Sequence, residues 1–157
     1  MQKISPFLWF DSQAEEAANF YVSLFDDAKI TDIARVPEGA PGVPGQVMTV
    51  AFRLAGQDFV ALNGGPQFAF TEAISFAVSC KDQAEVDRLW KELTDGGEES
   101  QCGWLKDRFG LSWQIIPDRL QVLLGDPDPE RAQRAMQAML QMRKIDVQAL
   151  EDAANGV

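Results

Sequence analysis

The sequence predicts an α+β fold in which a βαβββ module occurs twice and is followed by C-terminal helices. The length of 157 residues and the apolar content of 46% suit a single domain over 1–157 with one sizeable core. At an offset of 70 residues, Ile4-Ser5 aligns with Ile74-Ser75, and Gln13-Ala14-Glu15 aligns with Gln83-Ala84-Glu85. Both copies begin with period-two alternation and continue with helical spacing, which predicts a strand followed by a helix.

The first module is expected over residues 3–66. Alternating polarity predicts a strand over 4–10. Ser12 stands three residues before Glu15, a spacing that predicts a capping box at a helix start. The remaining strands expected here are 29–36, 47–54 and 58–63. A loop rich in proline and glycine separates the first two of these strands.

The second module is expected over residues 70–118. A strand over 74–80 leads to Asp82 and Glu85, which have the same capping-box spacing. Gly96-Gly97 ends the helix. Two further strands, 101–106 and 111–117, form a hairpin in which Lys106-Asp107-Arg108 is interpreted as an exposed tip.

A helical extension is expected over residues 119–154. Asp128 followed by Pro129 is typical of a helix start, and Asp146 is expected to cap a last short helix. Between them, Met136 and Met139 lie on one helical face with other apolar residues. We favour packing of this face on the domain or on a second copy over a ligand-adaptive lid, because methionine fills irregular apolar gaps.

Charge and composition exclude several classes of function. Fourteen Lys and Arg against twenty-four Asp and Glu give a net charge of −10, which disfavours nucleic acid and anionic membranes as partners. The absence of histidine excludes His-dependent triads and His-ligated metal centres. With two cysteines and neither a leader nor a long apolar run, we expect a reduced, cytoplasmic protein.

Several strings carry a resemblance to a known family. They are FLWFD at 7–11, FVALNGGP at 59–66, FTEAISF at 70–76, QCGWLKD at 101–107 and GLSWQ at 110–114. Together with the repeated module, they resemble the PhnB-like family, also labelled 3-demethylubiquinone-9 3-methyltransferase, over nearly the whole chain including the tail at 136–140. This family belongs to the vicinal oxygen chelate superfamily, with glyoxalase I, bleomycin and fosfomycin resistance proteins and extradiol dioxygenases. The resemblance implies the glyoxalase/bleomycin resistance/dihydroxybiphenyl dioxygenase fold, a half-open barrel around a shared cavity, and a homodimer.

The same resemblance identifies four positions where superfamily enzymes hold a divalent metal. They correspond to Ser5, Asn63, Ser75 and Gln114, all of them neutral amides or hydroxyls. Transition metals and zinc prefer imidazole, thiolate or carboxylate, so we expect no bound metal. A methyltransferase cofactor site of the Rossmann type needs a glycine-rich turn from strand to helix, and none of the glycine pairs has that context, so we expect no cofactor either.

Aromatic and neutral polar residues remain as candidates for ligand binding. The candidates are Phe7, Trp9, Asn63, Ser75, Trp104 and Gln114, with Trp113 and Arg53 as further possible lining. Tryptophans are often core residues whatever the function, whereas amides facing a cavity need partners that a ligand or water could supply. We therefore favour a small-molecule binding protein of the resistance type. The alternative is an enzyme, namely a lyase, an isomerase or a transferase.

Two further side chains have a reactive and an inert interpretation. Cys102 lies near Lys106 and Arg108, cations that favour a thiolate, yet without a histidine to activate it an inert thiol is favoured. Glu72 could act as a general base if burial raised its pKa, although a solvated loop carboxylate is the simpler interpretation.

Overall fold

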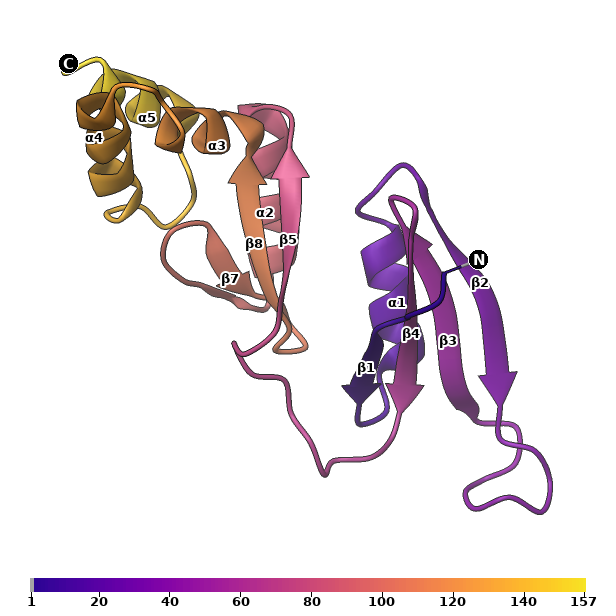
Figure 1. The fold of residues 1–157 in the computed structure, drawn as a ribbon. Helices are drawn as coiled ribbons and strands as arrows, with labels where there is room; N and C mark the ends of the chain where they lie inside the picture. Colours follow the sequence, from indigo (N-terminus) through magenta and orange to yellow (C-terminus); the bar gives the residue numbers. More distant parts are fainter. Residues whose placement is uncertain (1) are drawn as a thin grey trace. The chain divides into compact units, whose positions relative to one another are not determined.

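The computed structural model describes residues 2–157, which form two compact units. The first unit ends at Ala69, and the second is Phe70–Val157. Each unit contains one four-stranded sheet, with strand orders β1-β4-β3-β2 and β5-β8-β7-β6 (Figure 1). The same order of elements and strands therefore occurs twice, which confirms the predicted α+β class and the duplicated βαβββ module. Neither sheet closes into a barrel; the single domain over 1–157 and the shared cavity stay predictions.

The first unit consists of one helix on an open sheet. Its elements are β1 (Phe7–Phe10), α1 (Ala14–Val22), β2 (Ala28–Arg35), β3 (Val47–Leu54) and β4 (Gln57–Asn63). β1 pairs with β4 in parallel, and β3 lies antiparallel between β4 and β2. The helix α1 packs on the sheet mainly through β3 and β4 (Figure 1).

Alternation along β1 separates the core of this unit from its open face. Leu8 and Phe10 are buried on the side of α1, together with Tyr21 of the helix. Phe7, one residue away, is 62% exposed. Because successive strand residues point to opposite faces, Leu8 and Phe10 face the helix and Phe7 faces the open side of the sheet.

The start of α1 differs from the prediction. The N-cap is Gln13, which makes no side-chain capping bond, so the capping box expected from Ser12 and Glu15 is wrong. Instead the backbone N–H of Ala14 donates to Oδ1 of Asn63, at 2.8 Å, from the end of β4. A free N–H at a helix start can donate to any well-placed oxygen, and here a residue distant in sequence supplies that oxygen.

The second unit repeats the arrangement of the first. Its elements are β5 (Ser75–Cys80), α2 (Gln83–Thr94), β6 (Glu98–Glu99), β7 (Trp104–Lys106) and β8 (Ser112–Pro117). The capping box predicted for α2 is confirmed: Oδ1 of Asp82 accepts from the N–H of Glu85 at 3.0 Å, and Oε1 of Glu85 accepts from the N–H of Lys81 at 2.8 Å. The two-residue strand β6 was not predicted.

The turn between β7 and β8 is built around a buried carboxylate. Asp107 is only 3% exposed, so its interpretation as part of an exposed hairpin tip is wrong. Its Oδ1 accepts from the N–H groups of Phe109 and Leu111 at 2.8 and 3.1 Å, and its Oδ2 accepts from the indole of Trp113 at 2.9 Å. These bonds replace the hydration that a buried carboxylate loses.

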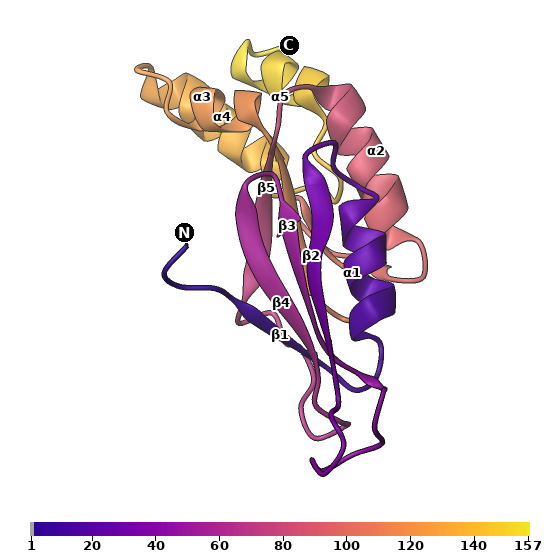
Figure 2. The same cartoon turned by 90° about the vertical axis from the view of Figure 1, so that its right-hand side faces the viewer.

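Three helices complete the second unit and lie together beyond the end of β8 (Figure 2). They are α3 (Asp118–Leu124), α4 (Pro129–Met139) and α5 (Val147–Ala154). The side chains of Asp128 and Asp146 accept capping bonds, as predicted. Met139 packs against a core that includes Leu120 and Leu150, in line with the packing interpretation of the methionine face. Among residues 2–157, none of the helices combines the length and apolar character that crossing a bilayer requires.

Candidate functional site

The second sheet has one face covered by α2 and one open face. Trp113 and Ile115 of β8 and Cys80 of β5 are buried on the covered face. On the open face, Gln114 lies opposite Trp104 of β7 on one side and Ala77 of β5 on the other. Ser75 projects from the same face of β5, because it lies two residues before Ala77. The open face therefore combines three of the predicted ligand contacts, Ser75, Trp104 and Gln114.

Polar groups on this face are only partly satisfied. Nε2 of Gln114 donates to Oγ of Ser75 at 2.9 Å. Within residues 2–157, Oε1 of Gln114 and the indole N–H of Trp104 have no hydrogen-bond partner. Both side chains are half-buried. One strong acceptor and one donor are thus available beside an aromatic ring.

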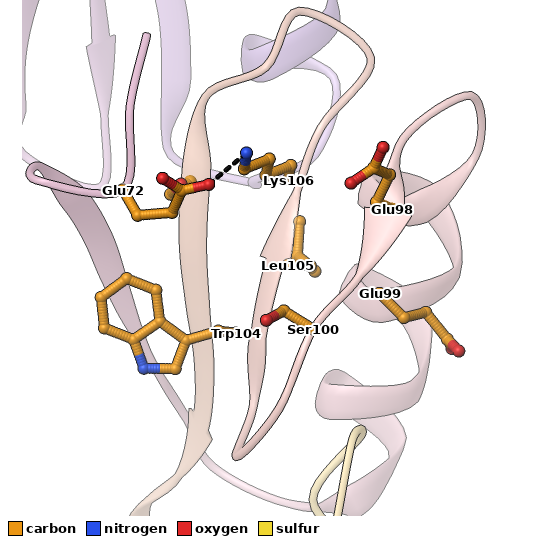
Figure 3. Close-up of a pocket in the computed structure, with 8 residues that line it drawn as sticks. Glu72, Glu98, Glu99, Ser100, Trp104, Leu105 and Lys106 are labelled. Carbon is orange, nitrogen blue, oxygen red and sulfur yellow. Dashed lines mark ion pairs between the residues drawn. The ribbon is translucent and has the colours of Figure 1, made fainter.

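A pocket of about 150 Å³ opens next to Trp104 (Figure 3). It is lined by Glu72, Glu98, Glu99, Ser100, Trp104, Leu105, Lys106 and Ser112. Lys106 forms an ion pair with Glu72. Ser112 is 1% exposed, and its Oγ has no hydrogen-bond partner in the described part of the chain. A buried hydroxyl without a partner is uncommon, which indicates that a bound molecule forms a hydrogen bond with it.

The ion pair fixes the charge state of Glu72. The hydrogen bond from Lys106 lowers the pKa of the Glu72 carboxyl, and the same bond raises the pKa of Lys106. The Glu72 side chain is also 60% exposed, and the effect of burial on its pKa is outweighed by the hydrogen bond from Lys106, contrary to the general-base interpretation. Glu72 is therefore an ionised carboxylate and a weak base.

The two aromatic candidates of the first unit differ in their surroundings. Phe7 is exposed on the open face of β1. Trp9, on the same face and half-buried, donates its indole N–H to the carbonyl of Gly65 at 2.9 Å and meets Phe68 edge-on at 4.9 Å between ring centroids. The Trp9 ring thus holds the segment that follows β4, and contact of either ring with a ligand stays a prediction.

Asn63 has its hydrogen-bonding groups satisfied within the first unit. Besides accepting from Ala14, it donates from Nδ2 to the carbonyl of Val47 at 3.1 Å. The need for a partner, which favoured a ligand contact at this position, is met by the chain itself. Arg53 is likewise engaged, in an ion pair with Asp58 at 2.7 Å.

The four positions that match the superfamily's metal ligands do not fit a metal. Asn63 uses both ends of its amide in hydrogen bonds, and Ser75 accepts from Nε2 of Gln114, which leaves Oε1 of Gln114 as a single neutral oxygen. Their donor atoms, like that of Ser5, are neutral amides or hydroxyls, which compete poorly for transition metals and zinc. In the described part of the chain, no group of three or more Cys, Asp or Glu side chains is placed to hold a metal ion.

The two cysteines lie apart from the pocket lining. Cys80 is buried, and desolvation raises the pKa of its thiol to about 12. Cys102 is half-buried in the loop before β7, with a left-handed φ of 59° and its backbone N–H donating to Met142 at 2.8 Å. The inert thiol expected at position 102 stays a prediction.

Apart from Glu72, sequence reasoning missed the polar residues of the pocket as candidate site residues. Lys106 was assigned to a hairpin tip, and Glu98 and Ser112 were given no role. Alternation along the predicted strands could have placed Ser112 and Gln114 on one face, since they are two residues apart. Glu98 could not be assigned to a face of the sheet, because β6 has only two residues and shows no alternation pattern.

Comparison with known proteins identifies the family. The model of the 3-demethylubiquinone-9 3-methyltransferase family matches residues 2–116. Contrary to the expectation, this match does not include the tail at 136–140. The PhnB protein of Bacillus cereus is 38% identical, with 74% of this chain and 99% of that chain covered and a TM-score of 0.68.

Two more distant structures show the fold alone. A protein from Pseudomonas aeruginosa is 20% identical, with 75% of this chain and 100% of that chain covered and a TM-score of 0.61. A gene product from Arabidopsis thaliana is 19% identical, with 74% and 98% covered and a TM-score of 0.52. None of the curated proteins matches the chain. On the family-model match and the similarity to the Bacillus cereus protein, the chain belongs to the PhnB-like 3-demethylubiquinone-9 3-methyltransferase family.

Proposed function

We propose that the protein binds a small organic molecule on the open face of the second sheet and needs no chelated metal to do so. The observation that carries the proposal is the set of unsatisfied polar atoms on this face: Oε1 of Gln114, the indole N–H of Trp104 and Oγ of Ser112. The Trp104 ring itself adds an aromatic surface to the same face. Ligand sites typically combine apolar surface with a few placed polar groups in this way.

The arrangement favours a ligand with a flat apolar part. The Trp104 ring supplies a half-buried aromatic surface for stacking. A donor on the ligand would form a hydrogen bond with Oε1 of Gln114, whose amide is held in place by the bond from its Nε2 to Ser75. Because Gln114 is already oriented, little side-chain entropy would be lost on binding.

The test is a ligand screen read at Trp104. A metabolite panel and divalent metals are first compared by thermal shift, since a ligand at one hundred times its dissociation constant stabilises a protein by about 2.7 kcal/mol. The indole N–H resonance of Trp104, assigned with Trp104→Phe, then reports binding at the site. We expect Gln114→Ala to weaken binding about tenfold, the effect of one lost hydrogen bond, and the exposed control Gln101→Ala to leave it unchanged. Full affinity in Gln114→Ala and Trp104→Phe would overturn the proposal, and so would a metal-specific shift lost in Gln114→Ala.

Enzymatic methyl transfer is a second candidate, favoured by the description of the family model. Against it, Gly64-Gly65 follow β4 without a helix and Gly96-Gly97 follow α2, so neither pair forms a strand-to-helix cofactor turn. Mass spectrometry of a bound ligand incubated with the protein and a methyl donor distinguishes the two candidates. Recovery of the unchanged ligand supports binding, and a gain of one methylene in mass supports methyl transfer.

We also infer a cytoplasmic homodimer. Both cysteines are free, in keeping with a reducing compartment, and Met136 of α4 and Leu140, directly after α4, are exposed. Light scattering coupled to size exclusion tests the oligomeric state. Conversion to a monomer by Leu140→Glu would assign the interface to α4, and a monomeric native protein would refute the dimer.

A further inference from the structure

We propose that the pocket beside Trp104 holds the charged end of the ligand, and that this end is an organic ammonium. The ligand class would be a primary or secondary amine attached to a flat apolar group. The inference rests on the proposed function and specifies which ligand that site takes. Its evidence lies in one row of side chains across the sheet, namely Ser112, Lys106 and Glu98.

The strand register places these three side chains on the same face. Lys106 of β7 lies opposite Ser112 of β8 and opposite Glu98 of β6. Directly opposite residues have Cβ atoms about 4.5 to 5.5 Å apart, so each side chain is within reach of its neighbour. Figure 3 shows the Glu98 carboxylate on the side of Lys106, whereas Glu99 points away.

The charges of the pocket leave one carboxylate without an ion-pair partner. Lys106 is paired with Glu72, and the attraction of Glu98 contributes less than that of Glu72 to the raised pKa of Lys106. Glu99 is engaged outside the row, by the indole of Trp90 at 2.6 Å and by Arg143 at 3.6 Å. Glu98 forms no ion pair or hydrogen bond with any described residue, so the pocket retains a negative charge.

Ser112 is the second, independent indication of a ligand. Its hydroxyl is buried at the pocket and has no partner among the described residues, although a hydroxyl oxygen can accept two hydrogen bonds. An ammonium group in the pocket can donate to this oxygen, while the Glu98 carboxylate, on the other side of Lys106, supplies the opposite charge. The Trp104 ring lines the same pocket and would cover the apolar part of the ligand.

An anionic ligand fits this pocket less well. To reach Lys106, it would have to displace Glu72 and approach the carboxylate of Glu98. The whole chain has a net charge of −10, which adds long-range repulsion of anions and attraction of cations. Local and overall charge therefore favour the ammonium.

The experiment compares three probes that share one phenyl ring. Phenethylamine is the cation, phenylacetate the anion and 2-phenylethanol the neutral analogue, each titrated at pH 7 into the full chain while the Trp104 indole resonance is followed. We expect the amine to bind at least tenfold more tightly than the other two. Glu98→Gln and Ser112→Ala should each weaken amine binding about tenfold or more, with little effect on the neutral probe. Glu92→Gln, an exposed carboxylate on α2, is the matched control and should change nothing.

The outcomes separate this inference from the proposed function. Binding of phenylacetate or the alcohol at Trp104 as tightly as the amine would refute the ammonium but leave small-molecule binding intact. Unchanged amine binding in Glu98→Gln would also refute it. If none of the three probes moves the Trp104 resonance while another molecule of the panel does so in a Gln114-dependent way, the site stands and the amine class is wrong. If nothing in either experiment moves it, both proposals fail.

Discussion

The side chain of Asn63 connects the end of β4 to the start of α1. Its amide accepts from Ala14 and donates to Val47, so one residue serves a helix terminus and a neighbouring strand. An amide in this position has the role that a capping residue has when it belongs to the helix itself. The hydrogen bonds of Asn63 thus serve the stability of the first unit.

Replacing Asn63 should therefore destabilise the first unit. We expect Asn63→Ala to lower the free energy of unfolding by about 1 to 2 kcal/mol, because it leaves a helix N–H and a strand carbonyl without partners. Asn63→Asp keeps the acceptor and should cost less. Urea denaturation measures both, with Gln13→Ala as the control, since Gln13 makes no capping bond from its side chain. A wild-type midpoint in Asn63→Ala would contradict the assigned role.

Gly64 is required by the ring of Trp9. A Cβ added at Gly64 would lie 2.4 Å from Cε2 of the indole, well inside van der Waals contact. We expect Gly64→Ala to cost roughly 1 to 3 kcal/mol, as overpacking does. In a Trp9→Ala background the same substitution should cost much less, and a double-mutant cycle by urea denaturation measures the coupling. Additive effects would mean that the indole moves aside freely.

At the scale of elements, the two helices of the repeat start by different means. α2 begins with its own capping box, Asp82 and Glu85, whereas α1 takes its cap from β4. The sequences at the two starts look alike, since both have an acceptor three residues before a glutamate. In the structure, α1 starts one residue later in the repeat than α2, with Gln13 as its N-cap, and Asn63 supplies the acceptor.

This difference gives a matched pair of substitutions. Asp82→Ala should lower the free energy of unfolding by about 1 kcal/mol, since it removes the acceptor for the N–H of Glu85. Ser12→Ala, at the equivalent position of the repeat, should change it by less than about 0.5 kcal/mol, as most surface substitutions do. Urea midpoints of the two variants compare them directly. Equal losses of unfolding free energy in the two variants would indicate that Ser12 does cap α1.

Local patterns predicted the elements, and contacts distant in sequence could not be derived from them. The strand over 47–54 was predicted to the residue, because alternation and flanking turn residues mark both ends. The bond between Ala14 and Asn63 joins residues 49 apart, and no local signal reports it. The burial of Asp107 was not predicted for a related reason. Its three hydrogen-bond donors come together only when the hairpin has formed.

The candidate site was predictable only in part. The alternation of polar residues on β5 correctly placed Ser75 on the face opposite the core, and the resemblance selected Gln114. The charged row beside them was not predictable, because the pairing of Glu98 with Lys106 depends on a two-residue edge strand. Sequence patterns of this length specify a face of the sheet but do not indicate which side chain remains without a partner.

At the scale of the whole molecule, the ionisable groups define the pH range of stability. The chain has no histidine, so no side chain with an ordinary pKa titrates between about pH 6 and about pH 8. Five carboxyls have their pKa lowered, chiefly by hydrogen bonds from Arg, Lys or backbone groups: Asp58, Glu72, Asp87, Asp126 and Glu151. They belong to both compact units.

The sign of the pH dependence is set by these lowered values. A carboxyl whose pKa is lower in the folded state stabilises that state fully above its unfolded pKa, which is ordinarily 3.8 for Asp and 4.5 for Glu. This stabilisation is lost as the pH falls through the folded pKa. We therefore expect the urea midpoint to be flat from about pH 8 to about pH 6 and to fall progressively below about pH 4.5. Because these pairs are largely exposed, added salt should reduce the acid-dependent change. A loss of stability between pH 7 and pH 6 would contradict this account, because carboxyls with a lowered pKa do not titrate in that range.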